Sequence, residues 1–190
     1  DEIPRIFRES GAIFVYATTE PEEALLLGGN TACLWEGRVT QFGPATEVYR
    51  HPIDTTTARV FSDPPMNFSA CTKAGGTLTF EVGSKVAASG NLSTVRDGDY
   101  VAGFRPNHLR FEKPNGPALE LTCQLVASEI TGSETFLHLR QGASRWVALV
   151  HGIHHLTDGT DVCLWLSTAH FHLFDTQGQL AVQAAYAAAA

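Results

Sequence analysis

The sequence predicts an α+β protein in which a short segment of alternating strands and helices precedes a larger, mostly β domain. Three observations support this fold class. An apolar stretch, Ala12 to Thr18, runs into an acidic, Leu-rich stretch, as a buried strand runs into a helix. Two prolines then interrupt regular structure between Ser62 and Phe68. Beyond them, short strand-like stretches alternate with Gly-containing turns, which is typical of a small barrel or sandwich.

The composition indicates a soluble globular protein. The chain has 190 residues, 44% of them hydrophobic, enough for one large or two small domains with a buried core. A formal net charge of −7 argues against a nucleic-acid partner, because phosphate binding relies on clustered Lys and Arg. No stretch reaches the roughly 20 apolar residues of a membrane span, and the start, DEIPRIFRES, is too charged for a signal peptide. The cysteines lack CxxC spacing, so we expect free buried thiols in a reducing cytoplasm; they are Cys33, Cys71, Cys123 and Cys163.

In the first third of the chain, Ala12–Thr18 (AIFVYAT) is predicted to form a parallel strand covered on both faces. A helix is predicted over Glu20–Leu27, because acidic residues suit its first turn and a Gly pair suits its end. Thr19, with Glu22 three positions on, matches a capping box. A hairpin turning at Glu36-Gly37 and two short helices follow, over Thr31–Trp35, Arg38–Phe42, Ala45–Arg50 and Thr56–Phe61.

The stretch SDPPMNF (Ser62–Phe68) predicts a domain boundary. We therefore expect one domain over residues 1–64, a second over 65–180, and a low-complexity Ala-rich tail over 181–190. The second domain is expected to be built from strands over Thr77–Val82, Lys85–Ala88, Tyr100–Phe104, Leu119–Ile130, Thr135–Gln141, Trp146–Val150, Asp161–Leu166 and Phe171–Phe174.

Six motifs follow one another in a characteristic order, from about Ser10 to about Leu180. They are FVYATTEPEEA, WEGRVTQFGPATEVYRHP, PPMNF, GFRPNHL, ITGSETFLHL and HFHLFD. Together they resemble the ATP-binding subunits of ABC importers of the maltose and glycerol-phosphate type. The first two resemble the switch-histidine strand and helix and the hairpin and helix that follow it. The third resembles the entry to the C-terminal regulatory domain, and the last three resemble pieces of that domain, a barrel of the oligonucleotide-binding-like kind called TOBE.

The resemblance implies that the chain is the C-terminal remnant of an α/β P-loop ATPase domain followed by an OB-like TOBE β-barrel. It implies a parent subunit that binds ATP and Mg, works as a homodimer or with a paired ATP-binding subunit, and drives a membrane permease to import a sugar, polyol or glycerol phosphate. It also implies a cytoplasmic protein, peripheral on the inner face of the cell membrane. The chain has no GxxxxGK[ST] loop, signature loop or Walker B strand, so alone it is expected to bind no cofactor and to be inactive.

Thr19 and Glu20 stand where the family pattern has a catalytic His followed by an Asp. The resemblance implies that this His reaches the γ-phosphate and the attacking water. A threonine hydroxyl falls roughly 2 to 3 Å short of an imidazole nitrogen, which ends direct contact. Three interpretations of Thr19 remain open: a helix N-cap, a degenerate switch position in a weakened ATP site, and a residue that binds phosphate through water.

The histidines also suggest a metal site, because HGIHH and HFHLFD could bring three imidazoles together for zinc. His170 and His172 would share one face of a strand at a spacing of two. However, HGIHHLTDG resembles an inter-strand turn of the family that holds no metal. We therefore expect no metal; the weak candidates are His154, His170 and His172, with His151 and His155 close by in the sequence.

Other polar residues are expected to be structural. Arg105, alone after an apolar strand, is expected to form a salt bridge or cap nearby carbonyls; the alternative is sensing of a small anion or an inhibitory partner. The carboxylates flanking turn glycines are expected to be solvated; they are Asp97, Asp99, Asp158 and Asp161. The tryptophans are expected in the core or an interface; they are Trp35, Trp146 and Trp165.

Two further functions compete with the importer subunit. One is a stand-alone regulatory or small-ligand-binding barrel without ATPase activity, in which the first 60 or so residues form a docking surface. The other is a small-anion store, because related barrels bind oxyanions, although the acidity of the chain counts against it. A GxxxxGK[ST] loop encoded upstream of Asp1 would distinguish the importer subunit from both.

Overall fold

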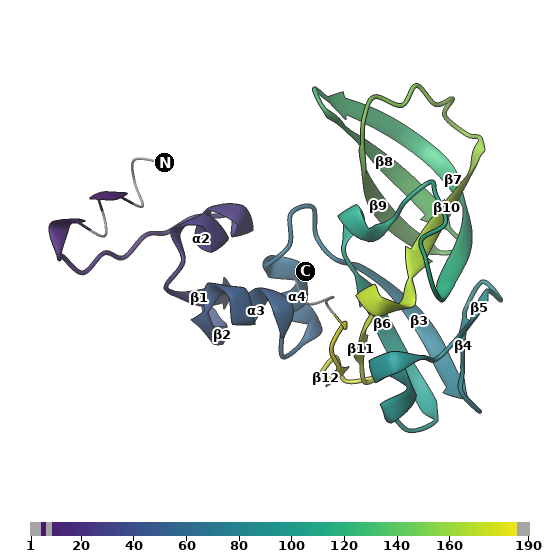
Figure 1. Ribbon diagram of the computed structural model, residues 1–190, viewed down its shortest axis with the longest axis horizontal. Helices are drawn as coiled ribbons and strands as arrows, with labels where there is room; N and C mark the ends of the chain where they lie inside the picture. The colour runs from purple at the N-terminus through teal and green to yellow at the C-terminus, as the bar shows by residue number, and fades with distance from the viewer. Residues whose placement is uncertain (1–4, 7–8, 186–190) are drawn as a thin grey trace.

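Two curled antiparallel sheets form most of the protein, and a short α/β segment precedes them (Figure 1). The computed structural model describes residues 5–6 and 9–185. One sheet has six strands in the order β12 (Leu180–Val182), β11 (His172–Phe174), β6 (Gly98–Phe104), β3 (Asn67–Ala74), β4 (Thr77–Phe80) and β5 (Lys85–Ala87). The other has four strands in the order β10 (Asp161–Ser167), β7 (Ala118–Thr131), β8 (Glu134–Gln141) and β9 (Ser144–His151). The predicted mostly β fold with a small barrel is confirmed, and the two sheets curl into a half-barrel.

The core of the barrel lies between the two sheets. Phe104 lies at its centre, with its ring edge-on to Trp146 at 5.1 Å and to Phe171 at 5.8 Å between ring centroids. Along β8 and β9, buried residues alternate with less buried ones, as expected of strands with one face in a core. The buried residues of these two strands supply much of the rest of the core. Trp146 is therefore a core residue, as predicted, and its indole nitrogen donates to the carbonyl of Phe68 at 2.9 Å.

The side chain of Asn67 joins the two sheets at an edge. Its amide nitrogen donates to the carbonyl of Val147 at 2.8 Å, and its oxygen accepts from the amide of Val147 at 2.9 Å. This reciprocal pair imitates the bonding of a neighbouring strand and satisfies groups on the edge of β9 that would otherwise lack partners. A side chain on β3 thus holds β9 where the two sheets approach each other.

Strand β3 and the short β12 were not predicted. Three inward residues of β3 are polar, Asn67, Ser69 and Lys73, so its sequence lacks the apolar alternation of a half-buried strand. The buried Lys73 ammonium meets Asp97 at 3.0 Å, and Asp97 also accepts from the amide of Gly75. These contacts, first the Gly75 bond and then Lys73, lower the pKa of Asp97. Asp97 is thus a partner of a buried cation, whereas the sequence predicted only a solvated turn.

The α/β segment contains α2 (Pro21–Leu27), β1 (Asn30–Trp35), β2 (Arg38–Pro44), α3 (Ala45–Arg50) and α4 (Thr55–Val60). The predicted hairpin is confirmed: β1 pairs with β2, and both turn residues, Glu36 and Gly37, have positive φ. The segment has its own small core of Cys33, Ala45, Val48 and Phe61, against which Ala24, Leu25 and Tyr49 pack. No helix in the described part of the chain is long and apolar enough to cross a membrane.

The predicted strand at Ala12–Thr18 is wrong. The whole stretch lacks regular structure and is exposed, with Ile13 at 98% and Val15 at 96%, and it runs away from the rest of the protein (Figure 1). A parallel strand covered on both faces requires neighbouring strands, and the described residues supply none for it. Its β-forming composition is therefore insufficient by itself to produce a strand.

The prediction for the cysteines was correct only in part. Burial raises the pKa of Cys71 and Cys123 to about 12 and that of Cys33 to about 11. Cys163 is exposed instead, because its neighbours on β10 face the core, and its thiol donates to Glu120. Residues 181 and 182, assigned to the tail, belong to β12, and residues 186–190 lie outside the described part.

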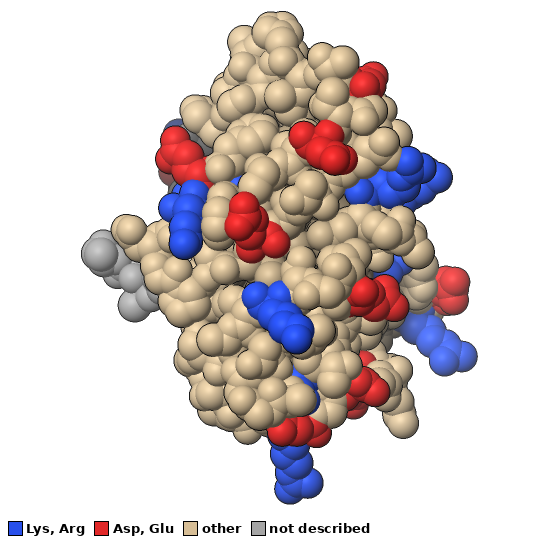
Figure 2. Space-filling model, turned by 90° about the vertical axis from the view of Figure 1, so that its right-hand side faces the viewer, with Lys and Arg blue, Asp and Glu red and all other residues tan. Residues whose placement is uncertain are grey.

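The face of the protein in Figure 2 carries charges of both signs. Figure 2 shows basic and acidic side chains interspersed over the face that it presents. Neither sign forms a continuous patch there, so this face does not present the clustered cations that bind nucleic-acid phosphates.

Candidate functional site

The opening junction precedes α2, and its local hydrogen bonds differ from the predicted capping box. Glu20 is the N-cap residue, and no side chain caps the helix. The hydroxyl of Thr18 accepts from the Glu20 amide at 2.9 Å and donates to Glu23 at 2.5 Å. Thr19 itself is exposed. The N-cap interpretation of Thr19 is therefore wrong, because Thr18 and Glu23 form the local bonds that were expected of Thr19 and Glu22.

This junction does not suit a phosphate by itself. Glu20, Glu22 and Glu23 place three carboxylates at the start of a seven-residue helix, and the described residues bring no Lys or Arg into hydrogen-bonding contact with them. The hydrogen bond from Tyr16 to Glu23, and then the charge of that carboxylate, raise the pKa of Tyr16. A nucleotide would therefore need cationic groups from elsewhere in a larger protein.

Arg105 is the most elaborately bound polar side chain in the barrel. It follows β6 directly, and its extended backbone fits the residue before a proline, here Pro106, which opens the short helix η2 (Pro106–His108). The side chain is 2% exposed. Its guanidinium donates to the carbonyl of Phe61 at 3.0 Å and to that of Tyr49 at 2.7 Å. It also lies 3.6 Å above the Tyr49 ring.

These contacts attach the barrel to the α/β segment. The two carbonyls lie near the C-terminal ends of α3 and α4, where a helix leaves acceptors unpaired and carries partial negative charge. The buried guanidinium of Arg105 supplies both hydrogen-bond donors for these acceptors and a positive charge beside the negative helix ends. Of the two structural roles predicted for Arg105, a salt bridge or a cap on nearby carbonyls, the structure shows the cap. Sequence reasoning missed the acceptors, because they lie 44 and 56 residues earlier in the chain.

Helix α4 has two further attachments to the barrel. At its start, the Thr55 amide donates to the Gly178 carbonyl and the Leu180 amide donates to the Ile53 carbonyl, both at 2.9 Å. Beneath it, Ala58 packs with Met66 and Phe174 in a separate apolar cluster. Helix α4 is thus fastened to the barrel at both ends and along one face.

One buried histidine, His172, and two half-buried ones, His108 and His170, follow Arg105 in the sequence. His108 on η2 stacks on His170, which ends the short helix η3 (Thr168–His170), at 3.9 Å between ring centroids. Burial first, and then nearby positive groups including Arg105, lower the pKa of His108 to about 2 and that of His172 to about 3. These rings are therefore neutral, and Nδ1 of His172 accepts from the amide of Ala184 at 3.3 Å.

The metal candidates have separate partners. His170 lies on η3 and His172 on β11, so the expected shared face of one strand is wrong, because the strand begins only at His172. His154 packs on Phe111 at 4.7 Å and bonds the carbonyl of His151. Among the described residues, no three His, Cys, Asp or Glu side chains are grouped so as to hold a metal.

Residues 102–174 match the family model of the TOBE domain. The multiple sugar-binding transport ATP-binding protein MsmK of Streptococcus mutans is 27% identical, over 96% of this chain and 53% of its own length. The sn-glycerol-3-phosphate import ATP-binding protein UgpC of Chromohalobacter salexigens is 30% identical, over 93% of this chain and 48% of its own. The chain thus spans about half the length of these relatives.

A solved structure of the cytoplasmic molybdate-binding protein ModG aligns with a TM-score of 0.43 at 17% identity, over 56% of this chain and 94% of its own. The sequence relatives extend across the α/β segment as well as the barrel, since they align with more than nine-tenths of the chain. The chain therefore corresponds to the C-terminal part, with the TOBE domain, of the ATP-binding subunits of sugar and glycerol-phosphate ABC importers.

Proposed function

We propose that this chain is the part of an ATP-binding subunit that connects the ATPase domain to a regulatory barrel, in an importer of a sugar, polyol or glycerol phosphate. The names of the relatives supply the solute class. The observation that carries the connecting role is the buried Arg105, which bonds carbonyls of Tyr49 and Phe61 across the junction. The proposal includes a dimer of such subunits against a membrane permease, at the cytoplasmic face of the membrane.

A continuous series of contacts supports this connecting role. The opening junction leads into α2, whose Ala24 and Leu25 pack against the small core of the segment. That core contains Phe61 and contacts Tyr49, the two residues whose carbonyls Arg105 holds. A displacement of α2 therefore has a packed path to the barrel, and such a path is the physical requirement for coupling between two sites.

ATP with Mg supplies the phosphoryl chemistry when the whole subunit binds it. In this proposal Thr19 and Glu20 face the nucleotide, and Thr19 is a degenerate switch position. Its exposed hydroxyl is too short to align the attacking water as an imidazole would. The subunit therefore hydrolyses ATP slowly, unless a paired subunit supplies the histidine.

The test uses the full-length subunit with its permease in proteoliposomes, and measures ATP-dependent uptake and ATPase turnover. We expect Thr19→His to raise turnover by about one to two orders of magnitude. Thr19→Ser is the matched control, because it keeps a short hydroxyl at the same position and should leave turnover unchanged. If Thr19→His leaves turnover unchanged while uptake occurs, the degenerate-switch argument is wrong. If neither ATPase nor uptake is present, the transport proposal is wrong.

A further inference from the structure

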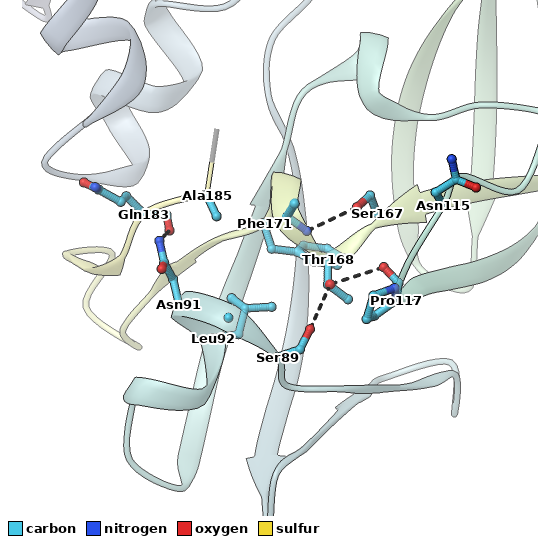
Figure 3. A pocket seen from close by; sticks show the side chains of 12 residues that line it. Ser89, Asn91, Leu92, Asn115, Pro117, Ser167, Thr168, Phe171, Gln183 and Ala185 are labelled. Atoms are coloured by element: carbon cyan, nitrogen blue, oxygen red, sulfur yellow. Dashed lines mark hydrogen bonds between the residues drawn. The ribbon is translucent and has the colours of Figure 1, made fainter. Parts of the chain in front are cut away.

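A cavity of about 210 Å³ lies where four separate parts of the chain meet at one end of the barrel (Figure 3). They are the short helix η1 (Gly90–Thr94), the loop before β7, the end of β10 with η3, and the chain after β12. A cavity of this volume holds several waters or one small molecule.

The wall of the cavity is polar but uncharged. None of the residues that line it is Lys, Arg, His, Asp or Glu. Its accessible apolar surface comes from Pro117, Ala169 and Ala185, whereas Leu92 and Phe171 are almost fully buried behind the wall. Three hydroxyls and three carboxamides provide polar groups, from Ser89, Ser167, Thr168, Asn91, Asn115 and Gln183. An apolar floor with a few neutral polar groups suits a neutral ligand with several hydroxyls, because no charged partner favours an ion there.

Several of these polar groups retain free hydrogen-bonding capacity. The Thr168 hydroxyl is committed, since it donates to the Pro117 carbonyl at 3.2 Å and lies 3.3 Å from the Ser89 hydroxyl. Ser167 only accepts, from the Ala169 amide, so its own O–H is available. The Asn91 amide reaches the Gln183 carbonyl at 3.4 Å, which leaves its oxygen available as an acceptor. The cavity thus offers both donors and acceptors, as a hydroxyl group requires.

We propose that this cavity binds a small neutral polyol. The ligand bridges Asn91 on η1 and Ser167 at the end of β10. Because Gln183 lines the same cavity, the bound polyol also holds the chain after β12 against η1. A phosphorylated polyol is rejected, because no cation lines the cavity to compensate its charge.

The test titrates ribitol into the full 190-residue chain and follows amide chemical shifts by NMR, with calorimetry for the affinity. Glycerol is the smaller probe and glycerol 3-phosphate the charged one. We expect saturable, millimolar binding of ribitol, with shifts concentrated at Asn91, Ser167 and Gln183. Asn91→Ala should weaken it about fivefold, as for the loss of one hydrogen bond. Asn107→Ala, an exposed asparagine on η2, is the matched control and should leave the affinity unchanged.

The inference is overturned if ribitol causes no saturable shift, if its shifts spread over the surface, or if glycerol 3-phosphate binds as tightly. It is also overturned if Asn91→Ala and Asn107→Ala have the same affinity. Thr168→Val provides a second variant, and its NMR spectrum shows whether the cavity is intact. An intact cavity should still bind ribitol, because the Thr168 hydroxyl already donates to the Pro117 carbonyl and is not needed for the ligand. None of these measurements needs nucleotide or permease, so their failure leaves the transport proposal standing.

Discussion

Replacement of Arg105 should destabilise the protein more than any other single change of a polar residue described above. Arg105→Ala removes two hydrogen bonds from a charged donor, each contributing about 1.5 to 3 kcal/mol. It also removes a cation–π contact, which contributes about 0.5 to 2 kcal/mol. Water can partly replace the donor at the two carbonyls, and the variant no longer buries a charge. We therefore expect a net loss of about 4 kcal/mol in the free energy of unfolding.

The assay is guanidinium chloride unfolding followed by tryptophan fluorescence. The Trp35→Phe background restricts the signal to the barrel, because Trp146 and Trp165 lie on its strands and Trp35 lies on β1. Arg105→Lys should cost about 2 kcal/mol, since an ammonium keeps the charge but cannot span both carbonyls and stack flat on Tyr49.

Arg59 provides the matched control. Its guanidinium also lies over a ring, that of Phe68 at 5.2 Å, but the side chain is exposed. Arg59→Ala should therefore cost only about 0.5 kcal/mol. A loss below about 1 kcal/mol for Arg105→Ala, or equal losses for both alanine variants, would refute the argument that the buried cation stabilises the junction.

Two further predictions concern the interior. His108 and His172 have folded-state pKa values of about 2 and 3, below the unfolded value of about 6.5. The contribution of the two neutral rings to the free energy of unfolding is therefore complete above pH 6.5 and is lost as the pH falls below it, by up to about 1.4 kcal/mol per pH unit for each ring. Urea unfolding between pH 8 and 5 should show this slope. His108→Gln should reduce the slope by about half. Gly103→Ala should lower the free energy of unfolding by about 1 to 3 kcal/mol, because a Cβ there would lie 2.8 Å from both Met66 and Phe174. Gly43→Ala, whose Cβ would meet nothing closer than 3.9 Å, is the control and should change thermal stability little.

The strands that could be predicted from sequence are those whose inward residues are apolar. β8 and β9 alternate strictly enough for local pattern alone to locate them. β3 could not be found in this way, because its inward Asn67 and Lys73 are satisfied by groups 80 and 24 residues away. The sequence near β3 does not show these distant partners, and without them a polar residue at an inward position argues against a strand.

The role of Arg105 was predicted in kind but not in its partners. A lone arginine after an apolar strand indicated a salt bridge or a cap on carbonyls, and the structure has the cap. The identity of those carbonyls depended on how α3 and α4 pack on the barrel. The pairing of His170 with His172 was wrong for a related reason: a spacing of two implies a shared face only if both residues lie on the strand, and a helical turn ends at His170.

The two helices next to Arg105 should respond differently when it is replaced. Helix α4 keeps its backbone bonds to Gly178 and Leu180 and its apolar contact with Phe174. Helix α3 packs within the small core of the segment, and Arg105 is what bonds its end to the barrel, through the Tyr49 carbonyl and ring. Loss of the cation therefore frees α3 before α4 and leaves the segment attached. The buried arginine thus controls the orientation of α3, the helix nearest to α2 and to the opening junction, more than it controls the attachment of the barrel itself.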